Sequence, residues 1–292
     1  MSDTINPDEN AIVPHAKQDL IVRSSGLAKR GLESLLAKEK RIIHFPIDRS
    51  IGRLWIGDTG AHFMSPFWGY SVKLLGDAKG TVEVPRGKFL ALFPTSSDLS
   101  ALSMLESTDL DGLDFTSKRL YGNDKYKFDN DHLVDLKRLT SLQLLNFSYT
   151  EISDAELAYL KGLTSLEWLD LHHTKISDAG LVNLEGLTSV QVLVLYDNPN
   201  ISDAGLVHLK ELTSLRALQL SCTEVSNNGL TYLRDILKNS TIAGGDTLTS
   251  TNDTKWDFED YLYIWRALYQ KPLKSQIPHR LFSMVEGWFS LP

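Results

Sequence analysis

Apolar residues recur at a fixed distance along the middle of the chain. The motif "LTSL" or "LTSV" occurs four times, at steps of 24, 24 and 25 residues, beginning at Leu139, Leu163, Leu187 and Leu212. Each copy leads into a stretch in which leucines alternate with other residues, and then into "SDAE", "SDAG" or "SNNG" and further leucines. Self-similarity at a period of roughly 20 to 50 residues is the sequence signature of a stacked repeat protein.

The second copy indicates what one unit forms. In "LEWLDLHHTKISDAGLVNL", Leu169 and Leu171 alternate with Trp168 and Asp170, which is the period of a short half-buried strand. Ser177 is a favourable N-cap, and the leucines of "LVNL" give the helical turn after it one apolar side. A unit this small cannot bury its leucines alone, so the units must stack around a continuous core.

These units resemble the leucine-rich repeat family, whose pattern L-x-x-L-x-L-x-x-[NT]-x-[IL] they carry with Thr at the usual Asn place. The match runs from Leu139 to about Leu237, and "LDGLDF" at 110–115 adds a divergent unit before it. The resemblance implies an α/β fold, a leucine-rich-repeat solenoid with a curved parallel sheet and short helices on the convex side. The repeats look most like those of bacterial leucine-rich repeat proteins and are also similar to those of F-box adaptors.

The segments that flank the repeats are expected to cap the solenoid, because its ends otherwise expose core. We divide the chain into a polar N-terminal tail with an amphipathic helix (1–41), a β-rich N-terminal cap (42–105), the repeats (106–240), and a linker with a C-terminal helical cap (241–292). "SIGRLWI" and "GTVEVPRGKFLALF" alternate as strands do. "WDFEDYLYIWRALYQKP" places aromatic residues at helical spacing, which predicts either a cap over the last repeat or a separate binding motif.

Residues that alternate with the buried leucines are expected on the concave strand face. Neighbouring strands lie about 4.8 Å apart, so equivalent positions align into columns across the sheet. The columns gather aromatic and polar side chains near the centre, namely Tyr149, Trp168, Asp170, His172, His173, Tyr196 and Asp197. We predict that this group is exposed and binds a partner, since Trp and Tyr flanked by polar groups are typical of interface hot spots.

Three other interpretations of these residues stay open. The first is a metal-dependent enzyme that uses Asp170, His172, His173 and Asp197, since His and carboxylate bind zinc or iron. However, adjacent histidines on a strand point to opposite faces unless the strand has ended, and no phosphate-binding glycine loop accompanies them. The second is a substrate adaptor of a ubiquitin ligase, although residues 17–40 lack the Leu-Pro pair that opens an F-box. The third is a set of tolerated surface residues. The sequence favours a non-enzymatic binding protein without catalytic residues, metal or cofactor.

Charge and composition narrow the class of partner and the compartment. The chain has 292 residues and a net charge of −7, and the acidic excess lies in the repeats. A nucleic-acid surface would need a basic stripe, so a protein partner is expected. No run approaches the roughly 18 apolar residues of a membrane span, and the first residues lack a secretory signal pattern. The single cysteine, Cys222, suits a reducing compartment, which predicts a cytoplasmic location.

Overall fold

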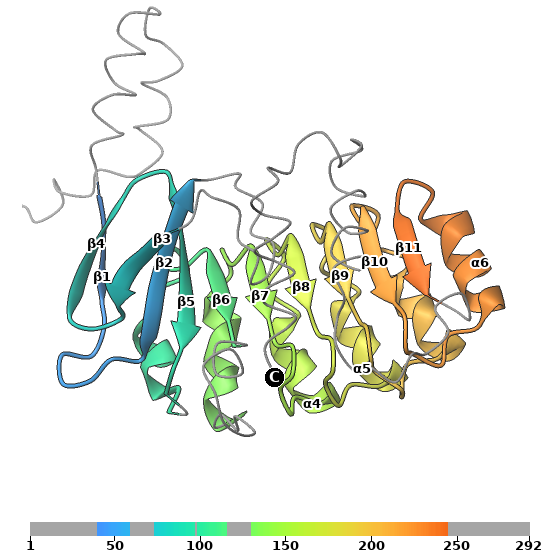
Figure 1. The fold of residues 1–292 in the computed structure, drawn as a ribbon, viewed down its shortest axis with the longest axis horizontal. Helices are drawn as coiled ribbons and strands as arrows, with labels where there is room; N and C mark the ends of the chain where they lie inside the picture. Colours follow the sequence, from blue (N-terminus) through green and yellow to red (C-terminus); the bar gives the residue numbers. More distant parts are fainter. Residues whose placement is uncertain (1–39, 59–72, 97, 116–129, 245–292) are drawn as a thin grey trace, which may run out of the picture.

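The structure is a computed structural model that describes residues 40–58, 73–96, 98–115 and 130–244. Within these ranges, strands form one nine-stranded sheet and a separate two-stranded sheet (Figure 1). The strands are β1 (Lys40–His44), β2 (Gly52–Asp58), β3 (Lys73–Asp77), β4 (Thr81–Pro85), β5 (Lys88–Pro94), β6 (Gly112–Asp114), β7 (Leu144–Asn146), β8 (Trp168–Asp170), β9 (Val192–Val194), β10 (Ala217–Leu220) and β11 (Thr241–Gly244). The helices and 3-10 turns are η1 (Ser100–Met104), η2 (Asn130–Arg138), α4 (Asp154–Leu157), η3 (Ala158–Leu160), α5 (Asp178–Leu181), η4 (Val182–Leu184), η5 (Asp203–Leu209) and α6 (Asn227–Ile236).

The strands from β5 to β11 pair in parallel, each with its neighbour along the chain. They are parallel because each unit returns the chain through a helical turn before the next strand begins. Leu145, Leu169, Leu193 and Leu218 stand opposite one another in the register of β7 to β10, and each is 0% exposed. The predicted α/β solenoid, a parallel sheet with short helices on one side, is confirmed.

One continuous core joins the strands to the helical turns. Leu181 and Leu184 of α5 and η4 belong to the same buried cluster as the strand leucines. The predicted divergent unit joins this core, because the Phe115 and Phe147 rings stack with centroids 4.8 Å apart. Each unit therefore buries its leucines against its neighbours, as the small size of the unit requires.

The N-terminal strands extend the same sheet, and they agree with the predicted β-rich cap. β2 lies between β3 and β5 and pairs with both in antiparallel fashion, while β1 and β4 form the two-stranded sheet. The Asp111 carboxylate holds the two parts together, since it accepts hydrogen bonds from Arg41 at 2.7 Å and from the Leu90 N–H at 2.8 Å. The boundaries of this cap at residues 42 and 105 stay predictions.

The structure corrects one boundary at the other end of the sheet. Residues 241–244, which we expected to be linker, form β11 and pair with β10 from Ala217 to Leu220. The glycines of "IAGG" predicted a loop, but the open edge of β10 offers backbone partners that the local sequence does not reveal. The predicted N-terminal helix, residues 116–129 and the predicted C-terminal aromatic segment lie outside the described residues.

A row of carboxylates connects the helical turns of successive units. Asp154 accepts hydrogen bonds from both the backbone N–H and the hydroxyl of Ser177, at 2.7 and 2.5 Å. The same pair of bonds joins Asp178 to Ser202 and Asp203 to Ser226. These bonds satisfy N–H groups that flank the start of each helical turn, where no intrahelical partner exists. The Asp of one "SDAG" or "SDAE" motif therefore binds the Ser at the same place in the next unit.

Sequence departures from "SDAG" occur at the two ends of this row. The first regular unit reads "SDAE", and Glu156 caps its own Ser153 through the backbone N–H at 2.7 Å and the hydroxyl at 2.8 Å. This arrangement is a capping box, and it serves a unit that has no such aspartate before it in the row. The last unit reads "SNNG", so Asn227 stands where the other units have the bridging aspartate. The row therefore spans the four regular units.

Candidate functional site

The predicted columns of the concave face, the side of the sheet away from the helices, are confirmed by the strand register. One column runs through Gly112, Leu144, Trp168, Val192 and Ala217. The next runs through Asp114, Asn146, Asp170, Val194 and Gln219. Trp168 has the largest side chain of these two columns, and it lies near the middle of the parallel strands. The bulky and polar side chains of the two columns therefore gather there, as expected.

The turns after the strands add a rim to this face. Tyr149, His173, Asp197 and Cys222 occupy equivalent places, and all four have left-handed backbones with φ between 52° and 58°. The N–H of Tyr149 donates to the His172 carbonyl at 3.0 Å, and the N–H of His173 donates to the Tyr196 carbonyl at 3.0 Å. Non-glycine residues rarely adopt this conformation, which the regular backbone bonding of the stacked units maintains here.

The left-handed turn decides how the two adjacent histidines are placed. Strand β8 ends at Asp170, so the two side chains do not alternate across the sheet. The Tyr149 ring lies 4.6 Å from the His172 ring and 4.9 Å from the His173 ring. The Tyr196 ring approaches His172 from the other side at 6.3 Å. The four rings form one aromatic group at the centre of the face.

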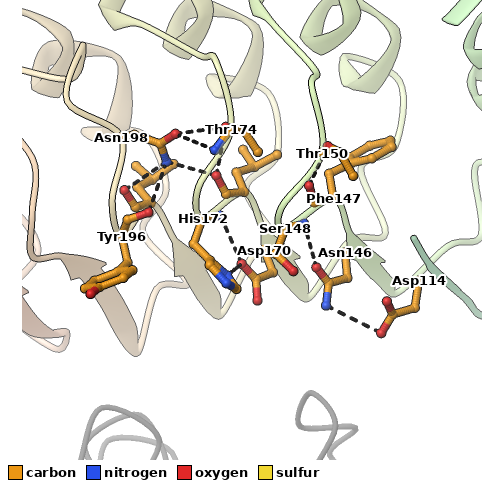
Figure 2. Close-up of polar contacts among 12 residues, drawn as sticks. Asp114, Asn146, Phe147, Ser148, Thr150, Asp170, His172, Thr174, Tyr196 and Asn198 are labelled. Carbon is orange, nitrogen blue, oxygen red and sulfur yellow. Dashed lines mark hydrogen bonds and ion pairs between the residues drawn. The ribbon is translucent and has the colours of Figure 1, made fainter. Parts of the chain in front are cut away.

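Each histidine has its own carboxylate. The Nδ1 atom of His172 lies 2.7 Å from Asp170 Oδ1, and the same oxygen accepts from the His172 backbone N–H at 3.1 Å (Figure 2). On the rim, His173 Nδ1 lies 2.6 Å from Asp197 Oδ2. The carboxylates orient the rings, and the pairs are separate: one lies on the face and the other on the rim.

The predicted exposure of this group is wrong for most of its members. Trp168 is 7% exposed, Asp170 1%, His172 3% and Tyr196 8%. Tyr149 and Asp197 are partly buried, and His173 alone is exposed. Alternation along a strand settles which side of the sheet a residue takes, but it does not settle what covers that side. Exposure on the face depends on side chains from several strands and on packing over them.

Asn198 is a polar residue that sequence analysis did not single out. Its side chain is fully buried and donates to the carbonyls of Leu171 at 2.9 Å and Leu195 at 3.0 Å (Figure 2). Its oxygen accepts from the N–H and the hydroxyl of Thr174, at 3.0 and 2.9 Å. The signal was present, because Asn198 fills the [NT] place of the repeat pattern in the one unit that has Asn there.

The group combines aromatic rings with two carboxylates. Among the described residues, no set of three or more His, Cys, Asp or Glu side chains is arranged to hold a metal ion. Within the same ranges, no helix has the length and apolar character needed to cross a membrane. What the geometry offers is a cluster of rings with two carboxylates, in which Tyr149, His173 and Asp197 reach the surface.

Comparison with known proteins finds leucine-rich repeat sequences and structures. A family model described as "Leucine Rich repeat" matches residues 211–233. Internalin C2 from Listeria monocytogenes is 25% identical with a TM-score of 0.39, and the match covers 51% of this chain and 56% of that one. An internalin (inlF) from the same organism is 24% identical with a TM-score of 0.39, covering 52% and 38%. A leucine-rich repeat protein from Leptospira interrogans is 20% identical with a TM-score of 0.33, covering 52% and 34%.

No curated protein matches the chain in sequence. The match spans between 34% and 56% of these solved chains, so it covers a part of each. The repeat pattern, the family match and the stacked units carry the assignment.

Proposed function

Because this chain is a leucine-rich repeat protein, we propose that it is a non-enzymatic module that binds a protein partner at the centre of its concave face and rim. The observation that carries the proposal is the aromatic group of Tyr149, His172, His173 and Tyr196, with ring centroids 4.6 to 6.3 Å apart. Clustered rings with hydrogen-bonding edges are typical of the residues that dominate binding energy in interfaces. The predicted site residues Trp168, Asp170 and Asp197 border this group.

The rim is the part of the site that a partner can meet first. The His173 side chain is 52% exposed and that of Asp197 is 30% exposed, and they hold each other in place. A preorganised pair loses little conformational freedom on binding, which favours affinity. The acidic repeats fit a neutral or basic protein surface rather than nucleic acid.

The geometry does not favour the alternative of a metal-dependent enzyme. Its four candidate ligands form two separate Asp–His pairs, whereas a zinc site needs three or four ligands around one point. The F-box-like adaptor depends on residues outside the described ranges, and no observation on the repeats favours it. A cytoplasmic location stays a prediction from the single cysteine.

The proposal is tested by capture of partners from the native cell with matched variants. His173→Ala with Asp197→Ala removes the exposed rim pair, and Tyr232→Ala removes an exposed aromatic side chain of α6 away from this face. A protein retained by the parent chain and by Tyr232→Ala, but lost with the rim variant, supports the proposal. The proposal is ruled out for this surface if the rim variant retains the same protein as the parent chain does, and if the purified partner binds both chains with equal affinity.

A further inference from the structure

The pair of His173 and Asp197 on the rim is anchored more firmly than an ordinary surface ion pair, whose long side chains are free to move. Both residues have left-handed backbones, and the N–H of Asp197 donates to the Ser221 carbonyl of the next unit at 3.0 Å. The residues that follow them are also joined, since the N–H and the hydroxyl of Thr174 donate to the Asn198 side chain at 3.0 and 2.9 Å. The two turns therefore present the pair in one fixed arrangement.

The Tyr149 ring supports His173 from the neighbouring turn. The two ring centroids lie 4.9 Å apart, and the ring planes make an angle of 41°. The same tyrosine ring lies 4.6 Å from the ring of His172, which is buried. Tyr149 thus connects the exposed histidine to a buried one, and the orientation of the His173 ring is set by a hydrogen bond and a ring contact together.

This geometry decides which hydrogen-bonding groups the pair turns outward. An ionised carboxylate only accepts hydrogen bonds, so Nδ1 of His173 is the donor in its 2.6 Å bond to Asp197 Oδ2. In the neutral ring Nδ1 then carries the proton, and Nε2 is an acceptor. Among the described residues, neither His173 Nε2 nor Asp197 Oδ1 forms a further hydrogen bond. The pair therefore offers two acceptors and one negative charge to solvent.

We propose that this pair binds an arginine side chain of the protein partner. The inference rests on the proposed function and names the chemistry that the rim recognises. A guanidinium group carries a positive charge and several N–H donors in a planar fork, so it serves two acceptors at different places. Its bond to the Asp197 carboxylate is charge-assisted, which makes it stronger than a neutral hydrogen bond. The lysine ammonium is a compact and more strongly hydrated charge, and it fits this pair less well.

The surroundings of the pair also favour a cation. The row of equivalent rim positions, which includes Tyr149 and Cys222, contains no Lys or Arg. Lys175 follows His173 by two residues, but its ammonium group is paired with Glu151. The charge of the Asp197 carboxylate is therefore left for a group that arrives from solution, and the side chain of this residue is 30% exposed.

A second pair of His and carboxylate on the convex side is an internal control. Nδ1 of His208 lies 2.7 Å from Glu185 Oε1, and the two side chains are 28% and 46% exposed. Within the described part of the chain, no aromatic ring contacts His208, and neither residue has a left-handed backbone. This pair has the same functional groups without the supports of the rim pair, so it should bind guanidinium more weakly.

The test is an NMR titration of the full-length chain, isotope-labelled at the histidine Cε1 atoms, with Nα-acetyl-arginine amide as the probe. The buffer is at about pH 8, where unperturbed imidazole is neutral, and His173→Gln and His208→Gln assign the two signals. The His173 signal should shift saturably and severalfold more than the His208 signal. Nα-acetyl-lysine amide should shift it severalfold less, and so should Nα-acetyl-citrulline amide, which has the shape of the arginine probe without its charge.

Two variants locate the binding. Asp197→Asn removes the charge and keeps the turn, because Asn tolerates the left-handed backbone at this position. It should abolish the response of His173 to the arginine probe. Glu185→Gln makes the same change in the convex pair and should leave that response as it is in the parent chain.

The proposal is overturned by an unchanged His173 signal, by equal shifts at His173 and His208, or by a full response in Asp197→Asn. An equal response to the lysine probe would show a general cation site, and an equal response to the citrulline probe would show a site that ignores charge. Either result also overturns the assignment to arginine. The titration needs no partner. A protein captured through the rim after a negative titration would therefore leave the proposed function standing and refute this inference alone.

Discussion

Gly205 lies directly against Asp178 of the preceding unit. A Cβ atom at Gly205 would stand 2.3 Å from Asp178 Oδ1, the oxygen that accepts from the Ser202 N–H. Gly180 and Gly229 have the same relation to Asp154 and Asp203. The glycine of "SDAG" is therefore required by the carboxylate of the unit before it, and not by its own backbone conformation.

Gly205→Ala should destabilise the chain, because the new methyl group displaces the Asp178 carboxylate from its hydrogen bonds. Overpacking of this kind costs about 1–3 kcal/mol in the free energy of unfolding, measured by urea titration. Gly162→Ala is the matched control, since a Cβ there meets no atom within 4 Å. The control should change stability by less than about 1 kcal/mol, in the stabilising direction. Equal effects at both glycines would contradict the steric argument.

The loss at Gly205 should depend on Asp178. Asp178→Ala alone removes two hydrogen bonds to Ser202 and should cost about 1–3 kcal/mol. With the carboxylate absent, the methyl group of Gly205→Ala has more room, so the double variant should lose less than the sum of the two single losses. A double-mutant cycle in urea measures the difference. Strict additivity would show that the two residues do not interact.

Asn198→Ala should be among the more damaging polar substitutions in the repeats. It leaves the Thr174 N–H without its acceptor and the Leu195 carbonyl without the Asn198 donor, at about 1–3 kcal/mol for each group left unsatisfied, whereas the Leu171 carbonyl keeps the Thr174 hydroxyl as a donor. Asn198→Thr tests the repeat pattern, because the equivalent Thr150 and Thr223 hydroxyls donate to the carbonyl three residues before them. The Thr variant should recover part of the loss, and thermal unfolding compares the two.

Trp168→Ala should reduce stability although the side chain lies outside the core. Its 7% exposure predicts a loss of about 2 kcal/mol, below the range of about 3–5 kcal/mol for a tryptophan in a packed core. Leu193→Ala, a core change in the neighbouring strand, should cost about 2–5 kcal/mol and sets the scale. Denaturant titration compares them. A loss at Trp168 within experimental error would mean that the concave face is open in solution.

The spacing of residues along the chain was enough to predict the fold and the strand register. The step of 24 or 25 residues fixes where each unit begins, and the two-residue period within a unit fixes which side of the strand each residue takes. Counting along the chain is therefore enough to place Leu169, Leu193 and Leu218 opposite one another. The two inner columns of the concave face follow from the same counting, because parallel strands in register place equivalent residues side by side.

The surroundings of those positions depend on contacts between parts of the chain that are distant in sequence. The burial of Trp168 and His172, the pairing of residues 241–244 with β10, and the contact between Asp178 and Gly205 all depend on groups far away in the sequence or in the next unit. A periodic pattern records the preference of a residue for one side of its own strand, whereas exposure and pairing depend on what else packs there. The left-handed backbone at His173 is of the same kind, since its N–H donates to the carbonyl of Tyr196 in the next unit.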